Sequence, residues 1–247
     1  MSGTICIIPA RYESKRFLGK VLADIGGKSI LSWIYDRVKQ VKGIDKVIVA
    51  TDNERIKNEV EGFGGIVELT RSDHPSGTDR VAEVAARIKN ADLIVNVQAD
   101  EPFISIDALE KGVNEMKTRP EIQMGTLVTE DCDINSILDI NHVKVVETED
   151  HFALYFSRSP IPFYRDILQT HYLKHIGVYF YKRDFLLKLV KLPQSRLELA
   201  ERLEQLRVLE NGYKIYLIKT DYNGISVDTV ADLKRAREYA LQMGWIS

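Results

Sequence analysis

The first half of the chain alternates between two apolar patterns, and this alternation limits the folds open to it. Short runs rich in β-branched residues, at 5–9, 46–50 and 93–97, are largely free of charge and predict buried strands. Between them, apolar residues recur at helical spacing, as at Ile30, Ile34 and Val38. Strands that alternate with amphipathic helices predict a mainly parallel sheet.

The second half has a different pattern, with several strands and few helices between them. Strands are expected at 124–129, 143–147, 152–156 and 172–181. A helix at 197–210, a strand at 214–219 and a last helix at 230–240 are expected after them. We therefore predict one α/β domain over residues 1–247, with a mainly parallel mixed sheet and a β-rich excursion at 124–181.

The charge balance and the cysteines exclude several classes of protein. The chain has 34 Lys and Arg against 36 Asp and Glu, so no broad basic surface is available for nucleic acid or an anionic membrane. Cys6 and Cys132 have neither the spacing of a zinc site nor that of a disulfide framework. The N-terminus has no signal-peptide pattern, and a cytoplasmic protein is expected.

A basic loop follows the first predicted strand. It carries Arg11, Lys15, Arg16 and Lys20. Loops at the carboxyl ends of parallel strands form the ligand crevice of such sheets, and clustered Arg and Lys side chains there suit a polyphosphate. On charge alone, a solvated basic loop remains the other interpretation.

A second loop, Ser72 to Arg80, precedes a predicted helix. Ser76 or Thr78 fits the position of a helix cap, and Gly77 permits close approach of the backbone to a flat base. Taken alone, the same residues are more typical of a turn followed by a cap than of a base-binding loop.

Two aspartates stand where predicted strands end. Asp100 follows the strand at 93–97, and Asp228 lies at the end of a short expected strand at 224–229. Magnesium prefers one or two carboxylates together with phosphate oxygens and water, so this pair is a candidate magnesium site. Asp228 is as well placed to cap the last helix, and the sequence leaves both roles open.

These segments, with others farther along, resemble one enzyme family. The matching blocks are Ile8-Pro9-Ala10-Arg11 with Ser14, Arg16 and Gly19-Lys20, then 49–52, 74–80, 98–102, 153–162, 175–177, 203–207 and 227–229. In order and spacing they are similar to the 3-deoxy-manno-octulosonate (Kdo) cytidylyltransferases, over nearly the whole chain. The resemblance implies a Rossmann-like nucleotidyltransferase fold, a homodimer, and a role in lipopolysaccharide synthesis in a Gram-negative bacterium. It also implies that the excursion contributes to the sugar site and to dimerisation.

The resemblance also assigns roles residue by residue. Residues implied to bind CTP are Ala10, Arg11, Ser14, Arg16, Lys20, Ser76, Gly77 and Arg80. Those implied to face the sugar acid are Gln98, Arg158, His175, Glu204 and Gln205. Asp100 and Asp228 would hold Mg²⁺ and, with Arg16 and Lys20, form the catalytic group.

Three other functions remain open at this level. A sialic-acid cytidylyltransferase would share the basic loop and the aspartates, but the 157–162 and 203–207 blocks look more like the Kdo enzyme. An enzyme for an 8-amino analogue of Kdo is not distinguished by sequence. A non-catalytic sugar-nucleotide binding protein would lack the metal carboxylates, and both carboxylates are present.

Overall fold

The structure is a computed structural model that describes residues 3–14, 16–165 and 171–246. The chain divides into two compact units, Met1–Glu110 with Gly224–Ser247 (unit 1) and Lys111–Asn223 (unit 2). The division falls within helix α4, Ile106–Thr118. The prediction of one domain with an excursion stays a prediction.

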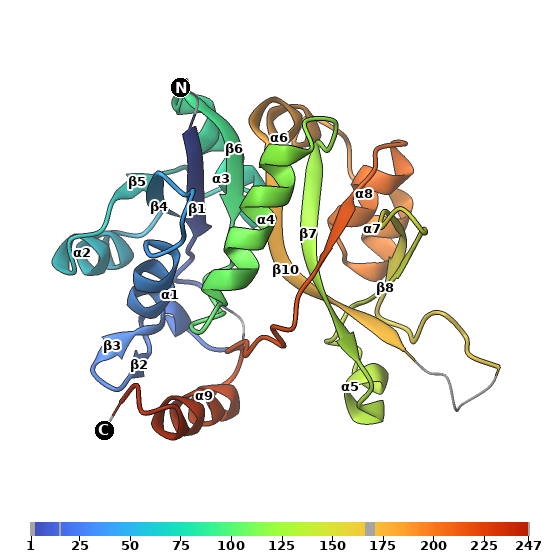
Figure 1. Cartoon of the computed structure of the whole chain (residues 1–247). Coiled ribbons are helices and arrows are strands. Elements are labelled where there is room, and N and C mark those ends of the chain that lie inside the picture. The colour runs from blue at the N-terminus through green and yellow to red at the C-terminus, as the bar shows by residue number, and fades with distance from the viewer. Residues whose placement is uncertain (1–2, 15, 166–170, 247) are drawn as a thin grey trace. The chain divides into compact units, whose positions relative to one another are not determined.

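Unit 1 contains a parallel sheet in the order β6-β1-β4-β5 (Figure 1). Its strands are β1 (Gly3–Pro9), β4 (Lys46–Thr51), β5 (Val67–Leu69) and β6 (Ala91–Asn96). A small hairpin pairs β2 (Asp24–Ile25) with β3 (Lys28–Ser29). Cys6, Ile7 and Ile8 of the central strand β1 are completely buried, as expected for a strand covered on both faces.

The helices of unit 1 are η1 (Lys20–Leu22), α1 (Ile30–Val38), α2 (Glu54–Gly62), α3 (Gly77–Arg87) and α9 (Val230–Gln242). Side chains of Ser29, Asn53 and Ser76 accept hydrogen bonds at the starts of α1, α2 and α3, which fixes where those helices begin. Helix α3 packs on β1, β4 and β6, whereas α9 lies beside β2 (Figure 1).

The carboxyl ends of the parallel strands in unit 1 meet at one edge of the sheet. Pro9 pairs with Ala50, and Ile7 pairs with Asn96. The loops after β1, β4 and β6 therefore start side by side, which is the arrangement that forms ligand sites in doubly wound sheets.

Unit 2 is built on a mixed sheet. Its strands are β7 (Met124–Asp131), β8 (Lys144–Glu147), β9 (Ala153–Ser157), β10 (Tyr172–Lys182) and β11 (Tyr216–Lys219). Strand β10 is antiparallel to β7 and to β8, β8 is antiparallel to β9, and β11 is parallel to β7. The helices are α5 (Ile134–Leu138), α6 (Arg183–Leu189), α7 (Arg196–Glu201) and α8 (Gln205–Glu210).

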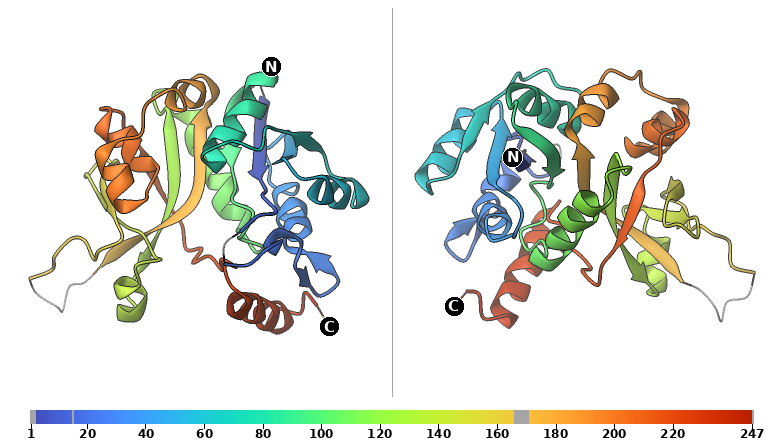
Figure 2. Two further views of the ribbon diagram at one scale, coloured as in Figure 1. Left: turned by 180° about the vertical axis from the view of Figure 1, so that it is seen from behind. Right: turned by 45° about the horizontal axis from the view of Figure 1, so that its top comes forward.

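Both parts of the predicted fold class are confirmed: a parallel sheet in the first half and a β-rich, largely antiparallel segment in the second. Two element predictions are wrong. The expected helix at 197–210 is two short helices, α7 and α8, which lie next to each other in Figure 2. Residues 224–229, all of them described, contain no strand. In the described residues, no helix has both the length and the apolar composition needed to span a bilayer.

Candidate active site

The basic loop after β1 is closed by a glycine. Gly19 adopts φ +67° and its N–H donates to the carbonyl of Tyr12 at 2.8 Å. A Cβ at this position would lie 3.1 Å from the ring of Tyr12, so both the backbone and the space favour glycine. Lys20 follows Gly19 directly and is the first residue of η1. The hydrogen bond that closes the loop therefore fixes the position of the Lys20 backbone.

Lys20 joins the two aspartates predicted to bind metal. Its Nζ lies 3.0 Å from Oδ2 of Asp100 and 2.8 Å from Oδ1 of Asp228. The Lys20 side chain is 15% exposed. Burial disfavours its charge, but attraction to Asp100 and Asp228 more than compensates and raises the pKa of Lys20 above its usual value. All four residues of the predicted catalytic group meet here, because Arg16 pairs with Oδ2 of Asp228 at 3.0 Å.

Asp228 is not the cap of the last helix. Thr229 is the N-cap of α9: its hydroxyl accepts from the N–H of Asp232, and the carboxylate of Asp232 accepts from the N–H of Thr229. This capping box leaves the Asp228 carboxylate to Lys20 and Arg16. The N–H of Val227 donates to the carbonyl of Asp100 at 2.8 Å, which holds the two aspartate segments together without a strand.

Ser76 and Gly77 lie beside the end of β1. Ser76 caps α3, and its hydroxyl donates to Asp79 at 2.7 Å. A Cβ on Gly77 would lie 3.5 Å from Pro9 and 3.9 Å from Oε1 of Gln98. The structure therefore brings together the residues predicted to border the base, including the fully buried Ala10.

Arg11 and Ser14 organise the loops around them. Arg11 donates to the carbonyl of His74 at 2.9 Å, which joins the basic loop to the loop before α3. The hydroxyl of Ser14 accepts from the N–H of Phe17 at 3.4 Å. Lys15 lies outside the described residues.

Arg80, which the resemblance implies binds CTP, is completely buried. Its guanidinium pairs with Asp52 at 2.9 Å and donates to Thr70. These partners follow β4 and β5, so Arg80 ties α3 to the ends of two strands. Its contact with nucleotide stays a prediction.

Among the residues predicted to face the sugar, Gln98 belongs to unit 1 and the other four belong to unit 2. His175 of β10 lies 2.9 Å from the hydroxyl of Thr126 and packs edge-on against Phe156. Burial lowers the pKa of His175 to about 3. The ring is therefore neutral at physiological pH and serves as a hydrogen-bonding group rather than as a cation.

Gln205 begins α8 and is only 4% exposed. Its Oε1 accepts from the hydroxyl of Tyr179 at 3.2 Å, while its Nε2 has no partner among the described residues. Glu204 precedes it as the N-cap residue of α8. The break between α7 and α8, where Arg202 takes φ +56°, starts a new helix at these two residues.

Arg158 follows β9 and is already bonded to main-chain oxygens. Its guanidinium donates to the carbonyls of Glu201 at 2.8 Å, Ile140 at 2.9 Å and Arg202 at 3.4 Å. The carboxylate of Glu201 accepts from the N–H of Arg158 at 3.0 Å. Arg158 thus joins the end of β9 to the segments that contain Ile140 and Glu201–Arg202. The sequence alone did not indicate this structural role.

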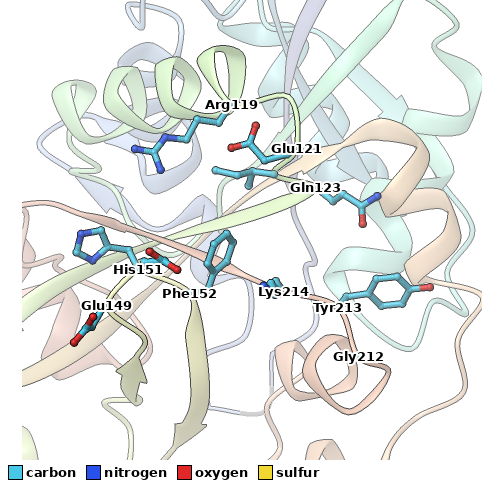
Figure 3. A pocket seen from close by; sticks show the side chains of 11 residues that line it. Arg119, Glu121, Gln123, Glu149, His151, Phe152, Gly212, Tyr213 and Lys214 are labelled. Atoms are coloured by element: carbon cyan, nitrogen blue, oxygen red, sulfur yellow. The ribbon is translucent and has the colours of Figure 1, made fainter.

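A pocket of about 730 Å³ lies elsewhere in unit 2 (Figure 3). None of its lining residues was predicted as a site residue. Acidic Glu121 and Glu149 stand among basic Arg119 and Lys214, and Lys214 lies over the ring of Phe152 at 5.1 Å. Opposing charges do not favour a triphosphate, so this pocket is a poor candidate for the nucleotide site.

Two residues that contact predicted site residues were not themselves predicted: Asp232, which bonds to Asp228, and Tyr179, which bonds to Gln205. Asp232 was detectable, because Thr229 followed three residues later by an acid is a capping-box pattern. Tyr179 was not, since its contact with Gln205 depends on the path of α8.

Comparison with known proteins identifies the family of the chain. A sequence model of the family described as cytidylyltransferase matches residues 5–215. A 3-deoxy-manno-octulosonate cytidylyltransferase of Geobacter sulfurreducens is 46% identical, over 94% of this chain and 97% of the relative. Another from Solibacter usitatus is 49% identical, over 93% of this chain and 91% of the relative.

The solved structures add a match in three dimensions. A structure of CMP:2-keto-3-deoxy-manno-octonic acid synthetase complexed with CTP superimposes with a TM-score of 0.94 and 41% identity, over 98% of this chain and 100% of that one. With matched sequence, fold and length, this chain belongs to the family of 3-deoxy-manno-octulosonate cytidylyltransferases.

Proposed function

We propose that this protein transfers CMP from CTP to Kdo, giving CMP-Kdo and pyrophosphate for lipopolysaccharide synthesis. One observation carries the chemical part of the proposal. Asp100 and Asp228 converge on one cation, Lys20, with Arg16 beside them. Family membership over nearly the whole length supports the choice of CTP and Kdo.

In the proposed reaction, the anomeric hydroxyl of the sugar attacks the α-phosphorus of CTP. A new O–P bond forms, the bond between the α-phosphorus and the bridging oxygen breaks, and pyrophosphate leaves on the opposite side. The proton of the attacking hydroxyl passes to water. Arg16 and Lys20 take up the charge that develops on the leaving group. The enzyme contributes positioning and charge, so no covalent nucleophile is required.

Magnesium is the proposed cofactor. The donor set fits it: two carboxylates already bracket one positive charge, and magnesium accepts one or two carboxylates with phosphate oxygens and water. Asp100 and Asp228 would hold the ion. When bound, it would neutralise phosphate charge and lower the pKa of the attacking hydroxyl.

Selection of the base is proposed to depend on Ala10, Ser76 and Gly77. Their closeness to the end of β1 supports this, because backbone groups at that edge of the sheet would form hydrogen bonds with the edge of a pyrimidine base. CTP should therefore far exceed ATP and GTP as a substrate, with weak use of UTP.

The sugar acid is proposed to contact Gln98, Arg158, His175, Glu204 and Gln205. The unpartnered Nε2 of Gln205 supports this, since a buried amide donor without an acceptor is costly in the absence of a ligand. A neutral His175 suits hydroxyl groups rather than the carboxylate. The carboxylate is assigned to Arg158.

We also propose a cytoplasmic homodimer that associates through the excursion. Several large apolar side chains are exposed within 124–181: Ile134, Leu138, Ile140, Leu154 and Phe163. Exposed apolar groups of this kind commonly mark interfaces between proteins. Light scattering should give the mass of a dimer, and Ile140→Asp should shift it toward that of a monomer.

A pyrophosphate-release assay tests the proposed function. The purified protein is given CTP and Mg²⁺ with Kdo, its 8-amino analogue or N-acetylneuraminate, in separate reactions. Release with Kdo alone supports the proposal. Preference for the 8-amino analogue or N-acetylneuraminate would change the acceptor, and no release with any of them would favour a non-catalytic binding protein.

A further inference from the structure

The space between the two aspartates already holds a cation, the ammonium group of Lys20. The Nζ–Oδ distances of 3.0 Å and 2.8 Å are those of charge-assisted hydrogen bonds. Arg16 occupies the other oxygen of Asp228 at 3.0 Å. Two positive side chains therefore neutralise the carboxylates without any bound ion.

A divalent ion bound to the same oxygens would have to displace this ammonium group. Two positive charges about 3 Å apart repel strongly in a partly buried site, where the effective dielectric constant is lower than in water. The Lys20 side chain is 15% exposed and that of Arg16 is 58% exposed. Because water screens its charge less, Lys20 opposes the binding of a metal ion more strongly than Arg16 does. It also keeps the carboxylates together when no ion is present.

A triphosphate offers Lys20 another anionic partner. The lysine lies at the end of the basic loop proposed to hold CTP, and its flexible stem lets the ammonium group turn from carboxylate to phosphate. From this geometry we infer that Lys20 keeps the metal site closed in the free protein and opens it when nucleotide binds. The inference rests on the proposed nucleotide site, and it predicts that the ion binds together with nucleotide rather than before it.

The test measures Mn²⁺ binding to the nucleotide-free protein by electron paramagnetic resonance, with no assay of activity. Wild-type protein should bind Mn²⁺ weakly. Lys20→Met should bind it about tenfold or more tightly, because the competing charge is gone and both carboxylates remain. Lys28→Met is the matched control: it removes an exposed lysine of the same unit, paired with Asp36, and should leave the affinity unchanged.

A second variant, Lys20→Gln, covers the case in which Lys20→Met fails to fold, and circular dichroism checks both. Tight Mn²⁺ binding to free wild-type protein would overturn the inference, as would equal or weaker binding to the Lys20 variants. Either outcome is distinguishable from failure of the proposed function. The pyrophosphate assay on wild-type protein decides that question separately.

Discussion

The carboxylate of Asp232 accepts a hydrogen bond of 3.0 Å from the backbone N–H of Asp228. The same oxygen accepts from the N–H of Thr229 at 2.7 Å. Burial disfavours the charge of Asp232, but a hydrogen bond from the Thr229 hydroxyl, together with these two backbone bonds, outweighs it and holds the pKa of Asp232 below its usual value. Asp232 thus fixes the backbone of Asp228 and completes the capping box of Thr229, so the Asp228 side chain is not used as a cap and faces Lys20.

Asp232 is therefore expected to position Asp228. Asp232→Ala should destabilise the start of α9 by about 1 kcal/mol and raise the Mg²⁺ concentration needed for half-maximal activity. Asp232→Asn keeps a side-chain acceptor and should restore part of the stability of α9 and part of the normal Mg²⁺ dependence. Asp107→Ala, which removes an acid from the first turn of α4, is the control. Unchanged Mg²⁺ dependence in Asp232→Ala would leave that residue a purely structural cap.

Asp100→Asn and Asp228→Asn should each lower turnover by at least about 100-fold, the size typical of removing one electrostatic group from a reaction centre. Each variant removes one carboxylate from the pair around Lys20 while keeping its shape. Chelation by EDTA should have the same effect on wild-type protein. Circular dichroism should show that both variants are folded. Near-normal activity of Asp228→Asn at limiting Mg²⁺ would remove that residue from the metal site.

The parallel strands and the loops that follow them could be predicted because their signals are local. Runs of β-branched residues and clustered basic residues are visible within a few positions of one another. The ion pairs of Lys20 join residues 80 and 208 positions apart, and no local pattern encodes such contacts.

The wrong predictions of a single helix at 197–210 and of a strand at 224–229 have the same cause. The spacing of apolar residues does not show where the backbone leaves a regular helix or strand. Leu199, Leu203 and Leu206 continue a helical stripe across Arg202, although Arg202 is left-handed and ends α7. Ile225 and Val227 alternate as in a strand, yet Val227 bonds to the carbonyl of Asp100 outside any sheet.

His175 should make stability sensitive to acid. Its pKa is lowered to about 3 in the folded protein, whereas an unfolded histidine titrates near 6.5. Between these values the unfolded chain binds a proton that the folded chain does not, so stability is full above about pH 6.5 and falls as the pH is lowered. The loss should be about 2 kcal/mol at pH 5.

Urea unfolding at pH 7 and pH 5 measures this loss. His175→Gln, whose amide can still bond to Thr126, should lose less stability over the same range. His151→Gln removes an exposed histidine and is the control. A protonated His175 ring at pH 5 in the NMR spectrum of the folded protein would contradict the prediction.

Arg158 provides the sharpest test of the acceptor, because the structure gives it a second role. Its guanidinium donates to the carbonyls of Ile140, Glu201 and Arg202, so it shapes the chain around it as well as offering charge to a sugar carboxylate. Arg158→Ala should raise the KM for Kdo by about 10- to 150-fold, since removing one side of a charged hydrogen bond costs about 1.5–3 kcal/mol. The KM for CTP should change far less.

Arg158→Lys separates the two roles of this residue. Lysine keeps the positive charge but lacks the planar fork that reaches several carbonyls at once. If charge pairing with the acceptor dominates, Arg158→Lys should recover most of the affinity for Kdo. If the carbonyl contacts dominate, it should resemble Arg158→Ala and lose thermal stability as well. Arg196→Ala, at an exposed arginine that begins α7, is the matched control. If Arg158→Ala changed only the KM for CTP, Arg158 would not belong to the sugar site. The proposal that the protein transfers CMP would still stand.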